Sequence, residues 1–154
     1  MTVDEFQELL KTVTDTIKGK PVRAELGEQL NTEFPPESAG FKAIAEACQT
    51  GIDEGWLCQY EGGGIRYGRV IKPTDELAGC SVDVVLMKDL KGPHHRHPNG
   101  EIDMVIPKIP GAKFDGQGAG WVVYDPDSAH SPTVTEGEAI VLYLLPNGAI
   151  EFTR

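Results

Sequence analysis

The sequence predicts a mainly β fold, an antiparallel sandwich or barrel with a helical N-terminal segment packed outside it. Two patterns support this prediction. Apolar residues recur at helical spacing in the N-terminal part, whereas from Gly62 onward short apolar stretches alternate with turns rich in Gly, Pro, Asn and Asp. A length of 154 residues suits one domain. We therefore expect a single domain over residues 1–154, with a helical extension over residues 1–60 and a strand-rich part over residues 61–154.

The first helix is expected to begin with a capping box, because residues 2–5 have the T-x-x-E pattern. Apolar side chains then recur at the spacing of one helix face. A second helix is predicted over residues 22–31, ahead of two prolines. A third is predicted to start near Ser38 and to be broken by Gly51 and Gly55. About sixty residues are marginal for independent folding, so we expect these helices to pack on the strands.

Period-two patterns and Val-rich stretches predict the strands of the second part. The strands are expected over residues 65–71, 80–90, 101–106, 120–124, 139–145 and 149–152. Short strands separated by Gly, Pro, Asn and Asp turns are typical of sandwiches and barrels.

The charge of the chain excludes several classes of partner. Lys and Arg number 14 against 24 Asp and Glu, which gives a net charge of −10. Such a chain repels the phosphates of nucleic acids and of anionic membranes, so we expect neither as a partner. The N-terminus is acidic without an apolar leader, and Cys48, Cys58 and Cys80 lack CxxC spacing. We therefore expect a cytoplasmic protein with buried, reduced thiols.

Three of the four histidines lie together in the segment over residues 92–101. On a strand, residues two apart face the same side, so His95 and His97 should project together, with their backbones about 7 Å apart. The Asn-Gly pair that follows is a strong hairpin signal. The hairpin is expected to bring Glu101 beside the two imidazoles, which makes these three residues candidate metal ligands.

A fourth candidate ligand is His130, which lies in a segment predicted to form a turn followed by a strand, and barrel closure can bring such a strand beside the first pair. Imidazoles with one carboxylate suit a divalent metal ion, Zn, Fe, Mn or Ni, with Cu as a further alternative. His94 and Arg96 face away by strand alternation and are left outside the site. The competing interpretation is a solvated, His-rich turn that binds metal only adventitiously.

Two carboxylates, Glu101 and Asp103, lie on the same face of one predicted strand. Glu101 either completes the ligand set or is a solvated surface carboxylate. Asp103 next to a metal would orient the ligands or act as a general base. Its alternative role is a salt bridge with an arginine inside the barrel.

The pattern His95-x-His97-x3-Glu101, with His130 downstream, resembles the two metal-binding motifs of the cupins. The flanking glycines of the first motif and the Pro–His spacing of the second depart from the cupin pattern. The resemblance implies a cupin-like antiparallel β-barrel, a double-stranded β-helix, over residues 61–154.

Longer stretches resemble the 4-hydroxylaminobenzoate lyase family. They are residues 40–48, 92–103, 120–124 and 145–148. The resemblance implies an ammonia-releasing lyase that converts 4-hydroxylaminobenzoate to 3,4-dihydroxybenzoate (protocatechuate) in nitroaromatic degradation. A bound metal would then act as a Lewis acid on the departing hydroxyl. Asp103 or Glu101 would take a proton from the attacking water, and Glu101 is the weaker candidate if it ligates the metal.

The implied substrate is a small aromatic carboxylate, which an acidic chain can hold only through a local cation. Arg66, Arg69 and Arg96 are the candidates, each with a surface ion pair as its alternative role. Strand alternation puts Arg66 and Arg69 on opposite faces, so at most one lines the interior, and it turns Arg96 outward. The aromatic residues that could stack on the substrate ring, or pack in the core instead, are Tyr67, Trp121 and Tyr124.

Two other functions remain open for such a barrel, because this fold hosts many activities. One is another cupin enzyme, either a dioxygenase that holds iron and consumes oxygen or an isomerase of sugars or keto acids. The other is a non-catalytic barrel that binds a small ligand. Barrels of this kind often pair through edge strands, so we also expect a homodimer.

Overall fold

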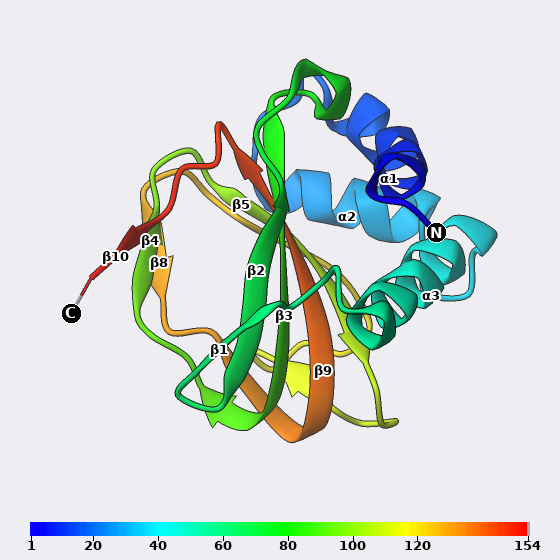
Figure 1. Ribbon diagram of the computed structural model, residues 1–154. Helices are drawn as coiled ribbons and strands as arrows, with labels where there is room; N and C mark the ends of the chain where they lie inside the picture. Colours follow the sequence, from blue (N-terminus) through cyan, green and yellow to red (C-terminus); the bar gives the residue numbers. More distant parts are fainter. Residues whose placement is uncertain (154) are drawn as a thin grey trace.

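The computed structural model describes residues 1–153, and Figure 1 shows its helices gathered on one side of a body of strands. The helices are α1 (Val3–Ile17), α2 (Ala24–Glu33) and α3 (Ala39–Glu54). The strands are β1 (Tyr60–Gly62), β2 (Ile65–Ile71), β3 (Cys80–Lys91), β4 (His95–His97), β5 (Glu101–Pro107), β6 (Lys113–Phe114), β7 (Gly120–Tyr124), β8 (Ser128–His130), β9 (Thr133–Pro146) and β10 (Glu151–Phe152). A short 3-10 helix, Asp75–Leu77, joins β2 to β3.

The strands form two antiparallel sheets. The large sheet has the order β1-β2-β3-β9-β5-β7, with β6 paired to β9, and the small sheet has the order β10-β4-β8. The mainly β, antiparallel fold predicted from the sequence is thus confirmed. Over the described residues the strands do not close into one hydrogen-bonded barrel, however, because those of the small sheet pair only with one another.

The large sheet is apolar on both faces, because alternate residues of its strands point to opposite sides. On the outer face, Leu142 of β9 belongs to one core with Leu10 of α1 and Ile44 of α3. On the inner face, Val105 and Val141 belong to a second core. The helices therefore pack outside the sheet, as expected, and the inner face borders the space where the two sheets meet.

The ends of the helices follow local sequence signals. Thr2 and Glu5 form the predicted capping box: the Thr2 hydroxyl accepts from the Glu5 backbone N–H at 3.1 Å, and the Glu5 carboxylate accepts from the Thr2 backbone N–H at 2.8 Å. Ser38 caps α3. Helix α2 lies two residues later than the predicted 22–31, because Arg23 is extended and serves as its N-cap.

The prediction that Gly51 breaks α3 is wrong. The helix continues and ends at Gly55, whose φ of 87° lies in the left-handed region that suits a C-cap. Gly51 serves a different purpose, since a Cβ at this position would lie 2.6 Å from the Leu57 side chain. The glycine thus lets the segment after the helix fold back closely against it.

Strand β9 is twice as long as the predicted 139–145. Its first half contains Glu136 and Gly137, whose φ values of 60° and 136° depart from extended backbone. This irregularity coincides with a shift of the β3–β9 register between Lys88 and Leu90. The hydrophobic alternation is lost over such a bulge, which explains why the pattern missed this half of the strand.

No helix within residues 1–153 is long and apolar enough to cross a membrane. Cys48, Cys58 and Cys80 are buried and free, as predicted. Burial raises the pKa of the Cys58 and Cys80 thiols to about 11, so both stay protonated and unreactive at neutral pH.

We infer that the helical and strand-rich parts form one domain, because the outer core contains residues of both. The two tryptophans provide a test, since Trp56 contacts Phe6 of α1 and Trp121 lies on β7. The single-Trp variants W56F and W121F should each unfold with one midpoint by fluorescence and by far-UV circular dichroism. Leu30→Ala, which removes a buried core side chain, should lower the free energy of unfolding by about 2–5 kcal/mol. Fluorescence and circular dichroism should report the same loss. Two separate transitions would contradict the single domain.

Candidate metal centre

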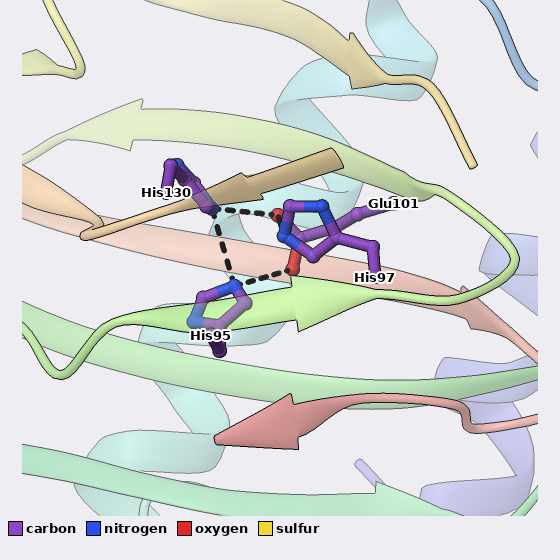
Figure 2. A group of neighbouring side chains, drawn as sticks. All are labelled: His95, His97, Glu101 and His130. Carbon is purple, nitrogen blue, oxygen red and sulfur yellow. Dashed lines mark hydrogen bonds and ion pairs between the residues drawn. The ribbon is translucent and has the colours of Figure 1, made fainter. Parts of the chain in front are cut away.

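The four side chains predicted as metal ligands converge where the two sheets meet (Figure 2). Strand β4 contributes His95 and His97, β5 contributes Glu101 and β8 contributes His130. His95 and His130 are direct partners in the β4–β8 pairing. One ligand atom from each residue lies within 4.8 Å of the others. His95, His97 and Glu101 are buried, and the His130 side chain is 14% exposed.

The turn that places Glu101 is not the predicted hairpin. Strands β4 and β5 belong to different sheets and are not paired, so the turn carries the chain from the small sheet to the large one. Glu101 therefore approaches the imidazoles from the facing sheet. Gly100 makes this bend with a φ of 88°, and a Cβ there would lie 2.9 Å from the Tyr124 carbonyl oxygen. A side chain at this position would thus be both strained and obstructed.

The Glu101 carboxylate contacts all three imidazoles. Its Oε1 lies 3.4 Å from Nε2 of His95, and its Oε2 lies 3.2 Å from Nε2 of His97 and 3.4 Å from Nε2 of His130. The Nε2 atoms of His95 and His130 are 3.1 Å apart. Both Glu101 oxygens and Nε2 of His97 nevertheless lack a properly directed hydrogen bond within residues 1–153. Such orphaned buried atoms, grouped around one point, are what a set of metal ligands requires.

A hydrogen bond outside the cluster orients His97. The Ser128 hydroxyl lies 2.6 Å from the Asp125 carbonyl oxygen, to which it donates, and 3.0 Å from Nδ1 of His97. Because the hydroxyl proton is used on the carbonyl, the Ser128 oxygen accepts the proton of Nδ1. The tautomer this selects leaves the Nε2 lone pair free toward the centre.

Asp115 holds His130 in the same manner. Its Oδ2 lies 2.6 Å from Nδ1 of His130 and accepts the Tyr124 hydroxyl at 2.5 Å, while its Oδ1 accepts the Thr133 backbone N–H at 2.9 Å. A carboxylate behind a ligating imidazole is a recurrent support in metal sites. The Tyr124 ring also packs on His130, with ring centroids 4.4 Å apart.

Glu101 and Asp115 make the environment of the imidazoles electronegative, as the pKa shifts within the centre indicate. Burial would raise the pKa of Glu101, but the three imidazoles outweigh it and hold this pKa well below its usual value. Burial lowers the pKa of His130, whereas Asp115 and Glu101 raise it to a net value of about 9. Three imidazole nitrogens and one carboxylate fit a divalent ion such as Zn, Fe, Mn or Ni.

Asp103 follows Glu101 on the inner face of β5 and is fully buried. Neither of its oxygens has a hydrogen-bond partner, and it forms no ion pair with any of residues 1–153, so the alternative salt bridge is not formed. Burial, together with the negative charge of Glu101, raises the pKa of Asp103 well above its usual value. Asp103 is therefore a buried carboxyl group that can hold a proton beside the cluster.

A cleft of about 680 Å³ opens beside the cluster, with His95 in its wall. Of the predicted substrate-binding residues, Tyr67 and Arg69 line this cleft and Arg66 and Tyr124 do not. Arg66 and Arg69 thus lie on opposite faces of β2, as alternation requires. The remaining wall is largely apolar, formed by Ile65, Val85, Met87, Pro93, Pro132, Ile150 and Phe152.

Three other residues weighed from the sequence lie outside the cleft. Arg96 faces outward and pairs with acidic side chains of neighbouring segments. His94 is directed to the hydroxyl of Thr153. Trp121 is a core residue, because it is buried and donates its indole N–H to the Phe34 carbonyl oxygen at 2.9 Å.

Sequence reasoning missed four residues around the site. Asp115 and Ser128 support the imidazoles, while Tyr143 and Lys91 line the cleft. No motif marks them: Asp115, Ser128 and Tyr143 have partners distant in sequence, and Lys91 lies just before the histidine segment without a pattern that distinguishes it. The alternation within β9 could have placed Tyr143 on the inner face, and it lies directly opposite Asp103 in the β5–β9 pairing.

Proteins of one known family are similar in sequence to this chain across most of its length. A family model described as "PnbB: 4-hydroxylaminobenzoate lyase" matches residues 8–152. The 4-hydroxylaminobenzoate lyase of Nocardioides sp. (strain LMS-CY) is 34% identical over 145 residues, covering 88% of this chain and 86% of that protein. The 4-hydroxylaminobenzoate lyase of Pseudomonas putida is 33% identical over 153 residues, covering 88% of this chain and 87% of that protein.

Among solved structures, an RmlC-like cupin protein from Ralstonia eutropha matches with a TM-score of 0.47 and 12% identity, covering 60% of this chain and 62% of that one. The sequence matches are far more extensive, because the family model and both relatives span nearly the whole chain. On this evidence the chain belongs to the 4-hydroxylaminobenzoate lyase family.

Proposed function

We propose that this lyase converts 4-hydroxylaminobenzoate and one water molecule to 3,4-dihydroxybenzoate and ammonia at the His95–His97–Glu101–His130 centre. The reaction needs no external oxidant, because the N–O bond of the substrate is itself reduced while the ring is oxidised. The observation that carries the proposal is a buried three-histidine, one-carboxylate cluster that borders an apolar cleft, in a member of this family.

The proposed ligands of a divalent metal are His95, His97, Glu101 and His130. When bound, the metal would supply Lewis acidity toward the oxygen that leaves the substrate nitrogen. Asp115 and Ser128 would keep the imidazoles of His130 and His97 in the ligating tautomer.

The cleft binds and orients the aromatic ring. Its apolar walls favour a flat ring and exclude bulk water from the reacting end. Tyr67 is proposed to contact the ring from β2, where it lines the cleft and is 44% exposed. Tyr124 is proposed to support His130 rather than to stack on the substrate, because it contacts that imidazole and Asp115.

Asp103 is the proposed proton carrier. Its carboxyl group gives a proton to the departing hydroxyl, which leaves as water and converts the substrate to a quinoid iminium. The resulting carboxylate accepts a proton from the water that adds at the ring carbon beside the C–N carbon. A second water hydrolyses the imine, ammonia leaves, and loss of the ring proton restores the aromatic product. Glu101 is less suited to proton transfer, because it contacts three imidazoles.

Tyr143 is proposed to donate a hydrogen bond to the substrate. It lines the cleft, only 5% of the residue is exposed, and it lies opposite Asp103. Burial and the negative charges of Asp103 and Glu101 raise its pKa well above the usual value, so the hydroxyl keeps its proton. A protonated phenol beside the reacting end can hold the hydroxylamine oxygen in place.

We further propose that the protein acts in the cytoplasm, in nitroaromatic degradation, and forms a homodimer. Three buried free thiols support a reducing compartment. Two of the edge strands, β1 of the large sheet and β10 of the small one, offer edges through which two copies could pair.

His97→Ala should abolish both metal binding and turnover, because it removes a buried ligand from the centre. Elemental analysis should show about one metal ion per chain in the wild type and little in the variant. Turnover is measured anaerobically as release of ammonia and 3,4-dihydroxybenzoate. His94→Ala, which removes an imidazole outside the centre, is the matched control and should behave like the wild type. Full activity in metal-stripped wild-type protein would exclude metal dependence.

Asp115→Asn and Asp103→Asn should separate support of the metal from proton transfer. Asp115→Asn should weaken metal affinity about 10- to 100-fold, because the amide holds His130 less firmly. Asp103→Asn should keep the metal and lower kcat about 10²- to 10⁴-fold. Asp125→Asn, an exposed carboxylate in a nearby turn, is the control. Loss of metal in Asp103→Asn, with activity restored by excess metal, would show that Asp103 is not the proton carrier.

A further inference from the structure

The charged side chains of the cleft restrict where a carboxylate can bind. This inference rests on the proposed function, in which the substrate carries its carboxylate at the ring position opposite the reacting nitrogen. The nitrogen must lie near the His95 end of the site, so the carboxylate must meet a cation elsewhere along the cleft. Besides His95, the charged or titratable residues that line the cleft are Tyr67, Arg69, Asp83, Lys91 and Tyr143.

Arg69 is already engaged by a carboxylate of the protein. Its Nε donates to Oδ1 of Asp83 at 2.7 Å, and its Nη2 donates to Oδ2 of Asp83 at 3.2 Å. Nη2 also donates to the Gly148 carbonyl oxygen at 3.1 Å. The Nε–Nη2 edge of the guanidinium, which can bind a carboxylate bidentately, is thus occupied by Asp83, and the charge of Arg69 is balanced within the wall.

The other two arginines considered from the sequence cannot replace it. Arg66 lies on the opposite face of β2, where its charge acts on the Cys58 thiol of the helix-covered core. Arg96 pairs with Glu151 and Asp127 on the outside of the small sheet. Neither lines the cleft.

Lys91 is the other cationic side chain that lines the cleft. It ends β3, its side chain is exposed at the cleft, and it forms no ion pair with any of residues 1–153. Lys91, Pro93 and His95 succeed one another at every second position along the cleft wall. Four residues of extended chain separate the Lys91 and His95 Cα atoms by at most about 13 Å. A long, flexible ammonium side chain can adjust within that span to reach the far end of a benzene ring.

We propose that Lys91 binds the carboxylate of the aromatic substrate and thereby selects 4-carboxylated hydroxylaminoarenes. The ammonium supplies a local positive charge that offsets the net charge of −10 carried by the chain. Pairing at a partly exposed site is modest in strength, so Lys91 should act on substrate affinity and selectivity and leave the chemical step intact.

Lys91→Met tests this role with two substrates that differ only in charge. Its kcat/KM for 4-hydroxylaminobenzoate should fall about tenfold through KM, while its kcat/KM for the neutral 4-hydroxylaminobenzamide should stay within about twofold of the wild-type value. Lys91→Arg should restore most of the discrimination, because the charge is kept. Lys88→Met removes an exposed lysine of β3 that does not line the cleft, and it should match the wild type.

Equal losses for both substrates, or no loss for either, would overturn the proposal. The proposal would also be overturned if Arg69→Met, rather than Lys91→Met, lost kcat/KM for 4-hydroxylaminobenzoate alone. That result would show that Arg69 leaves Asp83 to bind the substrate carboxylate. Calorimetric binding of 4-aminobenzoate and 4-aminobenzamide gives a readout that is independent of turnover. If the wild type releases no ammonia, the proposed function fails, yet weaker binding of 4-aminobenzoate alone to Lys91→Met would still support the anchor. Unchanged binding of both ligands would refute it.

Discussion

The structure depends on the burial of one carboxylate, Glu101, among three imidazoles. An ionised carboxylate removed from water is strongly disfavoured unless positive charge or hydrogen bonds compensate it. Here the Glu101 oxygens lie 3.2–3.4 Å from three Nε2 atoms and have no other partner among the described residues. Because Glu101 lies on the large sheet and the three histidines lie on the small one, these contacts join the inner faces of the two sheets.

Residues around Glu101 hold the imidazoles in place, and more distant elements position those residues. Ser128 and Asp115 set the tautomers of His97 and His130, and Tyr124 in turn donates to Asp115. The turn at Gly100 moves the chain from one sheet to the other, so that the seven-residue motif from His95 to Glu101 supplies proposed ligands from both sheets. The helices contribute indirectly: they bury the outer face of the large sheet and leave its inner face free for the site and the cleft.

Much of the fold and of the centre could be predicted because the signals are local. Strand alternation placed His95 with His97 and turned His94 and Arg96 away, and the capping box at Thr2 predicted the start of α1. The errors occurred where backbone geometry overrode the pattern. Gly51 lies inside α3 because Leu57 packs against it, and half of β9 was missed because Glu136 and Gly137 interrupt its alternation.

The sequence by itself determined the types of the candidate ligands, the spacing of His95 and His97 on one strand and the acidic charge that any anionic substrate must overcome. Only the tertiary structure decided that Glu101 approaches from the facing sheet and that Asp115 supports His130. It also decided that Arg69 is neutralised by Asp83, whereas Lys91 has no ion-pair partner within residues 1–153. The physical reason is that alternation and turns act over a few neighbouring residues. Which charges meet across two sheets depends on how distant strands pair.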